Sequence, residues 1–249
     1  MIIRRLIEII SENGRIGLLY VLALLVSIVF ALVLHEIAHG LVALWNGDPT
    51  AKLRGRLSLN PLRHFDVFGL LMMLFVGFGW AKPVPVDPRN FKNYKKGCIT
   101  VSIAGIVTNL LLAFVFSMVF VAIYVNFPWS PYLMNYVMPS GAGVNESVCY
   151  LVAFFLYLSA LMIQLNISFA LFNLLPLFPL DGYRLLACFV NENNGYMRFV
   201  RKYSLYIMLG LIALDYIPFV SAYSPFNLYI GFVGGWIQKG FIAFWGLIF

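Results

Sequence analysis

The sequence predicts an all-α polytopic membrane protein. Of its 249 residues, 62% are hydrophobic and 11% are charged, whereas soluble domains have roughly 45–50% apolar and about 25% charged residues. The apolar residues also form uninterrupted runs, and about 20 such residues in a helix are enough to cross a bilayer. We therefore expect a multi-pass protein of the cell membrane, with about five to six transmembrane helices and one re-entrant loop or β segment.

The first two elements follow from the charge pattern near the start of the chain. Residues 1–15 carry two arginines and two glutamates among isoleucine and leucine before Arg15, which suits an amphipathic helix at the membrane interface. The first uncharged run is Ile16 to Leu34, and its helical pattern continues to Trp45. Asn46-Gly47-Asp48-Pro49 then ends the helix, because proline and glycine interrupt helices.

Residues 46–97 are polar and rich in proline, and an apolar segment from Val67 to Ala81 interrupts them. That segment has 15 residues, fewer than the roughly 17–25 that a spanning helix needs. Its glycines, and the prolines that follow it, favour a re-entrant loop with extended backbone. Basic residues flank it on both sides and predict a cytoplasmic location: Lys52, Arg54, Arg56, Arg63, Lys82, Arg89, Lys92, Lys95 and Lys96.

Two long uncharged runs follow, Cys98 to Val125 and Ser147 to Leu180. The segment between them has no lysine or arginine, so we expect it outside the cell. Weaker spans are expected from Tyr203 to Val220 and from Phe226 to Phe249. The predicted organisation is an interfacial segment at 1–15, a membrane core at 16–190 and C-terminal transmembrane helices at 191–249.

The net charge of +7 does not indicate a nucleic-acid partner. The basic residues sit in short loops between apolar runs, where the positive-inside rule already explains them. The three cysteines show no paired spacing, so structural disulfides are not expected. The lipid bilayer is the partner that the composition predicts.

One sequence pattern combines residue types that can bind a metal ion and transfer a proton. His35-Glu36-Ile37-Ala38-His39 places two imidazoles one turn apart on one face of a helix, with a carboxylate beside them. These residue types at this spacing predict two zinc ligands, His35 and His39, and a general base, Glu36. The alternative is a buried polar cluster that ties helices together.

A catalytic zinc needs a third protein ligand and an open position for water. Asp181 is the first candidate, because it follows Pro176 and Pro179 at the end of an apolar run, where a carboxylate is expected to line a cavity or meet a metal. A re-entrant 67–81 segment would bring Asp181 and the histidines to the same membrane face. The alternatives are a helix-capping role for Asp181 and ligation by His64 instead.

Two asparagines are candidate supporting or substrate-binding residues. Asn109 lies about 16 Å into the second long span, at 1.5 Å per residue, and could hydrogen-bond across the close packing that Gly105 permits; a plain packing contact is the alternative. Asn173, just before the prolines, could satisfy backbone groups that they free or hold an extended substrate strand.

Three segments resemble the signature motifs of the site-2 proteases, intramembrane zinc metalloproteases that cut membrane-embedded segments: residues 35–39, 104–109 and 173–182. Residues 55–66 and 78–86 are similar to a compact subgroup of that family, and the resemblance covers about residues 20–190. Ile106 stands where the family pattern has a proline, and nothing resembles the PDZ or CBS domains of some members.

The resemblance implies that His35, His39 and Asp181 bind Zn²⁺, that Glu36 is the catalytic base, and that the substrate is a transmembrane protein. Two other functions stay open. A membrane metal-ion transporter would favour polar residues across the full bilayer thickness, whereas the charges here cluster at one depth. A catalytically inactive homologue that binds transmembrane helices is the second alternative, and the intact Glu36 argues against it.

Overall fold

The computed structural model describes residues 14–69, 72, 79–139, 145–191, 193–215, 217 and 223–249. The amphipathic segment expected at 1–15 lies almost entirely outside the described residues. So does most of the expected re-entrant segment, of which residues 70, 71 and 73–78 are not described.

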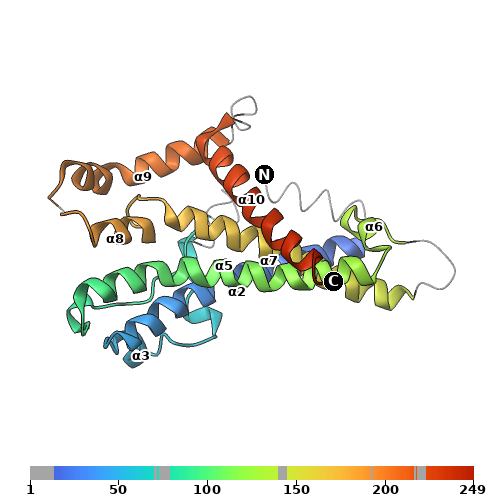
Figure 1. Ribbon diagram of the computed structural model, residues 1–249, viewed down its shortest axis with the longest axis horizontal. Helices are drawn as coiled ribbons and strands as arrows, with labels where there is room; N and C mark the ends of the chain where they lie inside the picture. Colours follow the sequence, from blue (N-terminus) through green and yellow to red (C-terminus); the bar gives the residue numbers. More distant parts are fainter. Residues whose placement is uncertain are drawn as a thin grey trace.

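Three long helices form the centre of the molecule and lie side by side (Figure 1): α2 (Gly14–Trp45), α5 (Tyr94–Asn126) and α7 (Glu146–Leu174). Within the described part of the chain, these three are long and apolar enough to cross a membrane. They agree with the three strongest apolar runs of the sequence. Helix α5 continues unbroken through Ile106, so the missing proline leaves a regular helix at that point.

The faces of α2 show how a membrane helix packs. Small residues, Ala23, Ser27 and Ala31, are fully buried against the neighbouring helices, whereas Leu18 and Leu22 are at least half exposed. Small side chains let helix backbones approach closely, and large apolar side chains can face lipid without cost. At these positions of α2, small residues therefore face the neighbouring helices and large apolar residues face outward.

Short elements cap the ends of the bundle: α3 (Thr50–Leu53), η1 (Pro61–Arg63), η2 (Pro88–Asn90) and α6 (Ser130–Met134). The loop after α2 is tied together by Asp48, which is buried. Its carboxylate accepts hydrogen bonds from the backbone of Thr50 at 3.1 Å and of Asp87 at 2.7 Å, and from the side chain of Asn90 at 2.8 Å. One carboxylate thus joins the end of α2 to residues that are 39 and 42 positions later in the sequence.

The expected re-entrant or β segment is not confirmed, and the residues that follow it, 82–87, belong to no assigned helix or strand. An isolated antiparallel bridge joins Phe65 to Ala81, and the Lys82 N–H donates to the His64 carbonyl at 2.7 Å. No strand is assigned within the described residues. This segment runs back toward α2 and ends at η2.

The C-terminal part contains α8 (Asp181–Ala187), α9 (Gly195–Asp215) and α10 (Pro225–Gly246). In Figure 1, α9 and α10 meet at an angle, and α10 crosses α5 and α7, on which Ile230 and Val233 pack. The expected count of about five to six spans is not confirmed, because α9 and α10 are not among the candidate spans. Arg198, Arg201 and Lys202 reduce the apolar character of α9.

Candidate metal centre

The two histidines of α2 and the aspartate at the start of α8 converge inside the bundle. Asp181 Oδ2 lies 3.3 Å from His35 Nε2 and 3.1 Å from His39 Nε2, and the two nitrogens are 3.1 Å apart. All three side chains are buried. Residues far apart in the sequence therefore present three ligand atoms to one point, and these three form a group that could hold a metal ion.

Each imidazole is oriented through its other ring nitrogen. His39 Nδ1 lies 2.7 Å from the Val101 carbonyl oxygen, and His35 Nδ1 lies 2.6 Å from Asn109 Oδ1. A carbonyl oxygen can only accept, so each Nδ1 carries the proton and each Nε2 offers a lone pair. This arrangement is the one that metal-binding histidines use.

Helix α5 supplies the wall against which His35 rests. A methyl group added at Gly105 would lie within 2.6 Å of three atoms of the His35 ring, far closer than van der Waals contact allows. Glycine is therefore required for the imidazole to occupy this position. Val101 and Asn109 lie four residues before and four residues after Gly105, on the same face of α5.

Asp181 reaches the site because the chain leaves α7 at Leu174 and turns sharply before α8. A Cβ at Gly182 would lie 2.2 Å from the Leu174 carbonyl oxygen, so the start of α8 packs directly on the end of α7. The cap residue of α8 is Leu180, and no side chain caps the helix. The alternative of a capping role for Asp181 therefore finds no support in the geometry.

The distances fit zinc. Tetrahedral ligands about 2.1 Å from a zinc ion lie about 3.4 Å from one another, close to the observed 3.1–3.3 Å. Asp181 Oδ2 is buried and has no hydrogen-bond partner among the described residues. Three lone-pair atoms at this separation repel one another unless a cation lies between them, so the donor set is suited to a metal.

A carboxyl group must be ionised to serve as a metal ligand. The Arg184 guanidinium approaches the other carboxylate oxygen of Asp181 only to 3.9 Å and is half exposed. The nearest charged or titratable neighbours of this carboxylate are therefore the two histidines and not the arginine.

Glu36 lies beside the histidines and is held by a backbone donor. Its Oε2 accepts a hydrogen bond of 2.8 Å from the Val84 N–H. Val84 stands between Pro83 and Pro85, which have no N–H. The segment thus directs one isolated N–H at the carboxylate expected to act as the base.

The other predicted residues, His64 and Asn173, are not part of the group of three. His64 is buried, and its Nε2 lies 2.7 Å from the Ser58 carbonyl oxygen, outside the group of three. Asn173 donates to the Phe169 carbonyl of its own helix at 3.0 Å, so in this state it makes a local helix contact. Asn166, which sequence reasoning did not single out, is fully buried and accepts from Asn109 at 2.6 Å.

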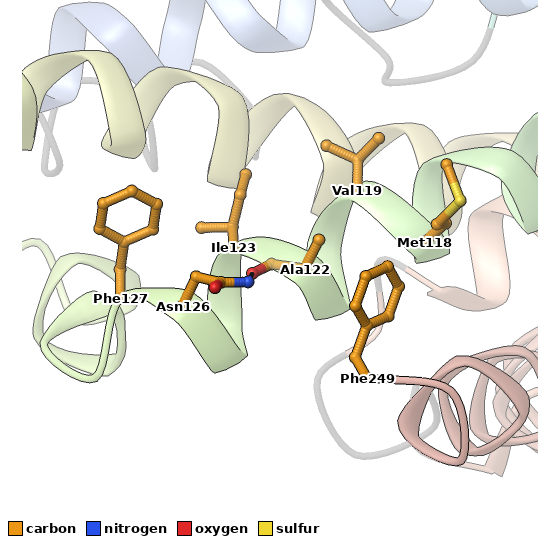
Figure 2. Close-up of a pocket in the computed structure, with 7 residues that line it drawn as sticks. All are labelled: Met118, Val119, Ala122, Ile123, Asn126, Phe127 and Phe249. Carbon is orange, nitrogen blue, oxygen red and sulfur yellow. Dashed lines mark hydrogen bonds between the residues drawn. The ribbon is translucent and has the colours of Figure 1, made fainter.

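An apolar groove of about 510 Å³ lies elsewhere, along the second half of α5 (Figure 2). Its nearest residue on that helix, Met118, is nine residues beyond Asn109, or about 14 Å at 1.5 Å per residue. Asn126 brings the one amide side chain of the groove, and no acid, histidine or cysteine lines it. The lining of this groove therefore offers no metal ligand and no general base.

Comparison with known proteins identifies the family. The family model described as peptidase family M50 matches residues 23–214, a range that contains all the residues of the candidate site. The chain belongs to peptidase family M50. This is the site-2 protease family, as the three sequence motifs suggested.

A similar relative of this M50 peptidase is a Bacillus subtilis protein named "Putative zinc metalloprotease YwhC". The two are 42% identical over 163 residues, which cover 66% of this chain and 67% of the relative. No solved structure matches the chain. Family and relative together support a metalloprotease, and zinc is the metal that they imply for the group of three side chains.

Proposed function

We propose that this protein is an intramembrane zinc metalloprotease that hydrolyses a peptide bond in or near the transmembrane segment of a membrane protein. The observation that carries this proposal is the convergence of His35, His39 and Asp181 inside a bundle of helices long enough to span a bilayer. Glu36 lies next to the first histidine in the sequence. A metal site with an adjacent carboxylate is the arrangement that peptide hydrolysis needs.

Each residue of the site has a separate role in the proposed reaction. His35, His39 and Asp181 would hold the zinc, which when bound lowers the pKa of water toward about 7 and polarises a carbonyl oxygen. Glu36 accepts the proton of the attacking water and then delivers it to the leaving amine. The Val84 N–H holds the Glu36 carboxylate in place. Asn109 keeps His35 oriented from the side away from the metal.

The proposed topology keeps the domain boundaries predicted from the sequence: an interfacial segment at 1–15, the protease core at 16–190 and further membrane helices at 191–249. In this topology α9 and α10 add to the three long spans, which gives about five, and residues 67–81 enter and leave on the cytoplasmic side. The nine basic residues at 46–97 support that orientation. Cysteine labelling at positions 52 and 92 from each side of the cell membrane tests it; opposite accessibility would contradict it.

The proposed substrate is a transmembrane helix that unwinds locally near its cytoplasmic end. A helical peptide bond is shielded by its own i to i−4 hydrogen bonds, and opening it in hydrocarbon leaves polar groups unsatisfied. The extended segment at 81–87 could pair with the opened strand, but its N–H groups at Lys82, Val84 and Asp87 are already bonded. The Lys82 carbonyl also accepts from Arg56 at 2.7 Å, and Asn173 donates to its own helix, so pairing would require some of these hydrogen bonds to be exchanged for bonds to the substrate.

The experiment compares three forms of the purified, reconstituted protein: wild type, Glu36→Gln and Asp181→Ala. A model transmembrane substrate is included, and both zinc content and cleavage are measured. We expect Glu36→Gln to bind zinc but not to cleave, and Asp181→Ala to lose both properties. Zinc transport into vesicles with no cleavage by the wild type would instead indicate a transporter. Zinc and substrate binding without cleavage would indicate an inactive homologue.

A second test addresses unwinding. Substrates with glycine, proline or asparagine near the cytoplasmic end are expected to be cut faster than versions carrying leucine or alanine there, because their helices open at lower cost. Equal rates for both versions, or a cut mapped to the external end, would refute the unwinding step while leaving the protease assignment intact.

A further inference from the structure

A continuous line of buried polar side chains runs from His35 into α7. His35 Nδ1 lies 2.6 Å from Asn109 Oδ1, Asn109 Nδ2 donates to Asn166 Oδ1 at 2.6 Å, and Asn166 Nδ2 donates to the Met162 carbonyl oxygen at 2.8 Å. His35 is 5% exposed, and both asparagines are 0% exposed. The line joins the three long helices of the bundle, α2, α5 and α7.

The Met162 carbonyl, at the α7 end of this line, fixes which atom donates and which accepts in each hydrogen bond of the line. The Met162 carbonyl can only accept, so the amide nitrogen of Asn166 must face it and the Asn166 oxygen must face Asn109. That oxygen can only accept, so Asn109 presents its nitrogen there and its own oxygen to His35. The His35 Nδ1 must then be the protonated ring nitrogen.

A reversed Asn109 amide would have the opposite effect. Its nitrogen would then face His35 Nδ1 and favour the tautomer that is protonated on Nε2, which cannot bind a metal through Nε2. Asn109 has one other contact for its nitrogen, the Ala31 carbonyl at 3.4 Å, which is a long hydrogen bond. The short bond to Asn166 is therefore the stronger restraint on the amide.

The second histidine provides an internal comparison. His39 Nδ1 faces the Val101 backbone carbonyl at 2.7 Å, and a backbone carbonyl cannot reverse. The two imidazoles are thus held in the same tautomer by different means, one through the backbone and one through two side-chain amides. Only the restraint on His35 can be removed by substitution of a side chain that touches neither histidine.

We propose that Asn166 is a positioning residue for the metal centre: it fixes the Asn109 amide, and through it the His35 tautomer that binds the metal. This inference rests on the proposed function, since it assumes that His35 ligates zinc. Asn166 acts without touching the metal, the substrate or either histidine. Partners of this kind typically contribute about 10–100-fold to metal affinity.

The test measures zinc affinity by competition with a chelator in the full-length protein in detergent. Asn166→Leu keeps the number and branching of the side-chain heavy atoms while removing both hydrogen bonds, and it is expected to weaken zinc binding by about 10–100-fold. Gln164→Leu is the matched control, because it replaces another α7 amide that is exposed, and it should leave zinc affinity unchanged. An effect of Asn166→Leu no larger than that of Gln164→Leu would overturn the proposal.

A double substitution tests the route. If Asn166 acts through Asn109, then Asn109→Leu combined with Asn166→Leu should bind zinc no more weakly than Asn109→Leu alone. Independent effects that multiply would contradict the relay. Failure of the wild type to bind zinc would instead refute the proposed function itself, so the two failures are distinguishable.

A measurement on the unmodified, metal-free protein tests the tautomer that the proposal requires, even if Asn166→Leu does not fold. Nitrogen-15 NMR of labelled histidine reports which ring nitrogen carries the proton. We expect His35 to be protonated on Nδ1 before any metal is added, as His39 is. A mixture of tautomers, or protonation on Nε2, would overturn the proposal.

Discussion

Gly105 and the His35 imidazole are in such close contact that no larger residue fits: an added methyl group would lie 2.3 Å from His35 Cε1. The contact joins α5 to α2 at the depth of the metal centre. It makes the position of His35 depend on a residue that has no side chain of its own.

We therefore predict that Gly105→Ala displaces His35 and lowers zinc affinity at least about tenfold, within the range seen when groups that orient a metal ligand are altered. Zinc competition with a chelator measures this. Gly235→Ala is the control, because nothing lies within 4 Å of a Cβ at that position of α10. Zinc affinity that is unchanged in Gly105→Ala would show that the His35 ring is free to move.

The choice of third ligand gives a second prediction. Asp181 Oδ2 lies within 3.3 Å of both imidazole nitrogens, whereas His64 lies against the Ser58 carbonyl. Metal analysis of the purified variants should find that Asp181→Ala loses zinc and that His64→Gln retains it. Retained zinc in Asp181→Ala, with loss in His64→Gln, would reverse the assignment.

Val84 offers a way to remove one backbone donor, with an alanine variant as the control for loss of its buried side chain. Val84→Pro deletes the N–H that binds Glu36, and Pro85 already confines Val84 to an extended conformation. We expect zinc content to be unchanged and the cleavage rate to fall by about tenfold, if one charge-assisted hydrogen bond contributes about 1.5 kcal/mol. Val84→Ala keeps the N–H and should cleave nearly as the wild type does. Equal rates in the proline and alanine variants would rule out a role for this N–H.

We predict that the loop held together by Asp48 becomes less stable at acidic pH. The carboxyl would be raised in pKa by burial, but hydrogen bonds from Thr50, Asn90 and Asp87 hold its pKa below the ordinary value of 3.8. A group whose pKa is lower in the folded state contributes stability that is complete above pH 3.8 and is lost as the pH falls through the folded value.

Hydrogen exchange of the Asp87 amide, which donates to Asp48, measures this loosening. The amide should be protected at neutral pH and lose protection below about pH 3.8, the unfolded value. In Asp48→Asn, which cannot titrate, protection should be lower at neutral pH and independent of pH in this range. A wild-type profile that stays flat down to pH 2 would contradict the prediction.

The sequence predicted the features that depend on local pattern. Uninterrupted apolar runs located α2, α5 and α7, and the spacing of His35, Glu36 and His39 located the centre of the site. Asp181 was found because a carboxylate after two prolines is unusual at the end of an apolar run. Each of these predictions depends only on the residues within one short stretch of the sequence.

The partners of these residues could not be predicted in the same way. The contact between Val84 and Glu36 depends on the path of a long loop, and Asn166 becomes important only because three helices bring it within reach of Asn109. Its one sequence signal is a buried-type position for an amide within an apolar run, which is costly in a membrane unless the amide is bonded. The sequence analysis named Asn173, which lies closer to the prolines, and did not name Asn166.

The order of the proposed ligands along the chain has a consequence for biosynthesis. His35 and His39 are made early, on the first long helix, whereas Asp181 is made only after α7 is complete. A growing chain that has not yet reached α8 has two of the three proposed ligands and lacks the charge that completes the site. Hydrolytic activity would therefore arise only once the third long helix is in place, and an unfinished chain in the membrane would pose no hazard to its neighbours.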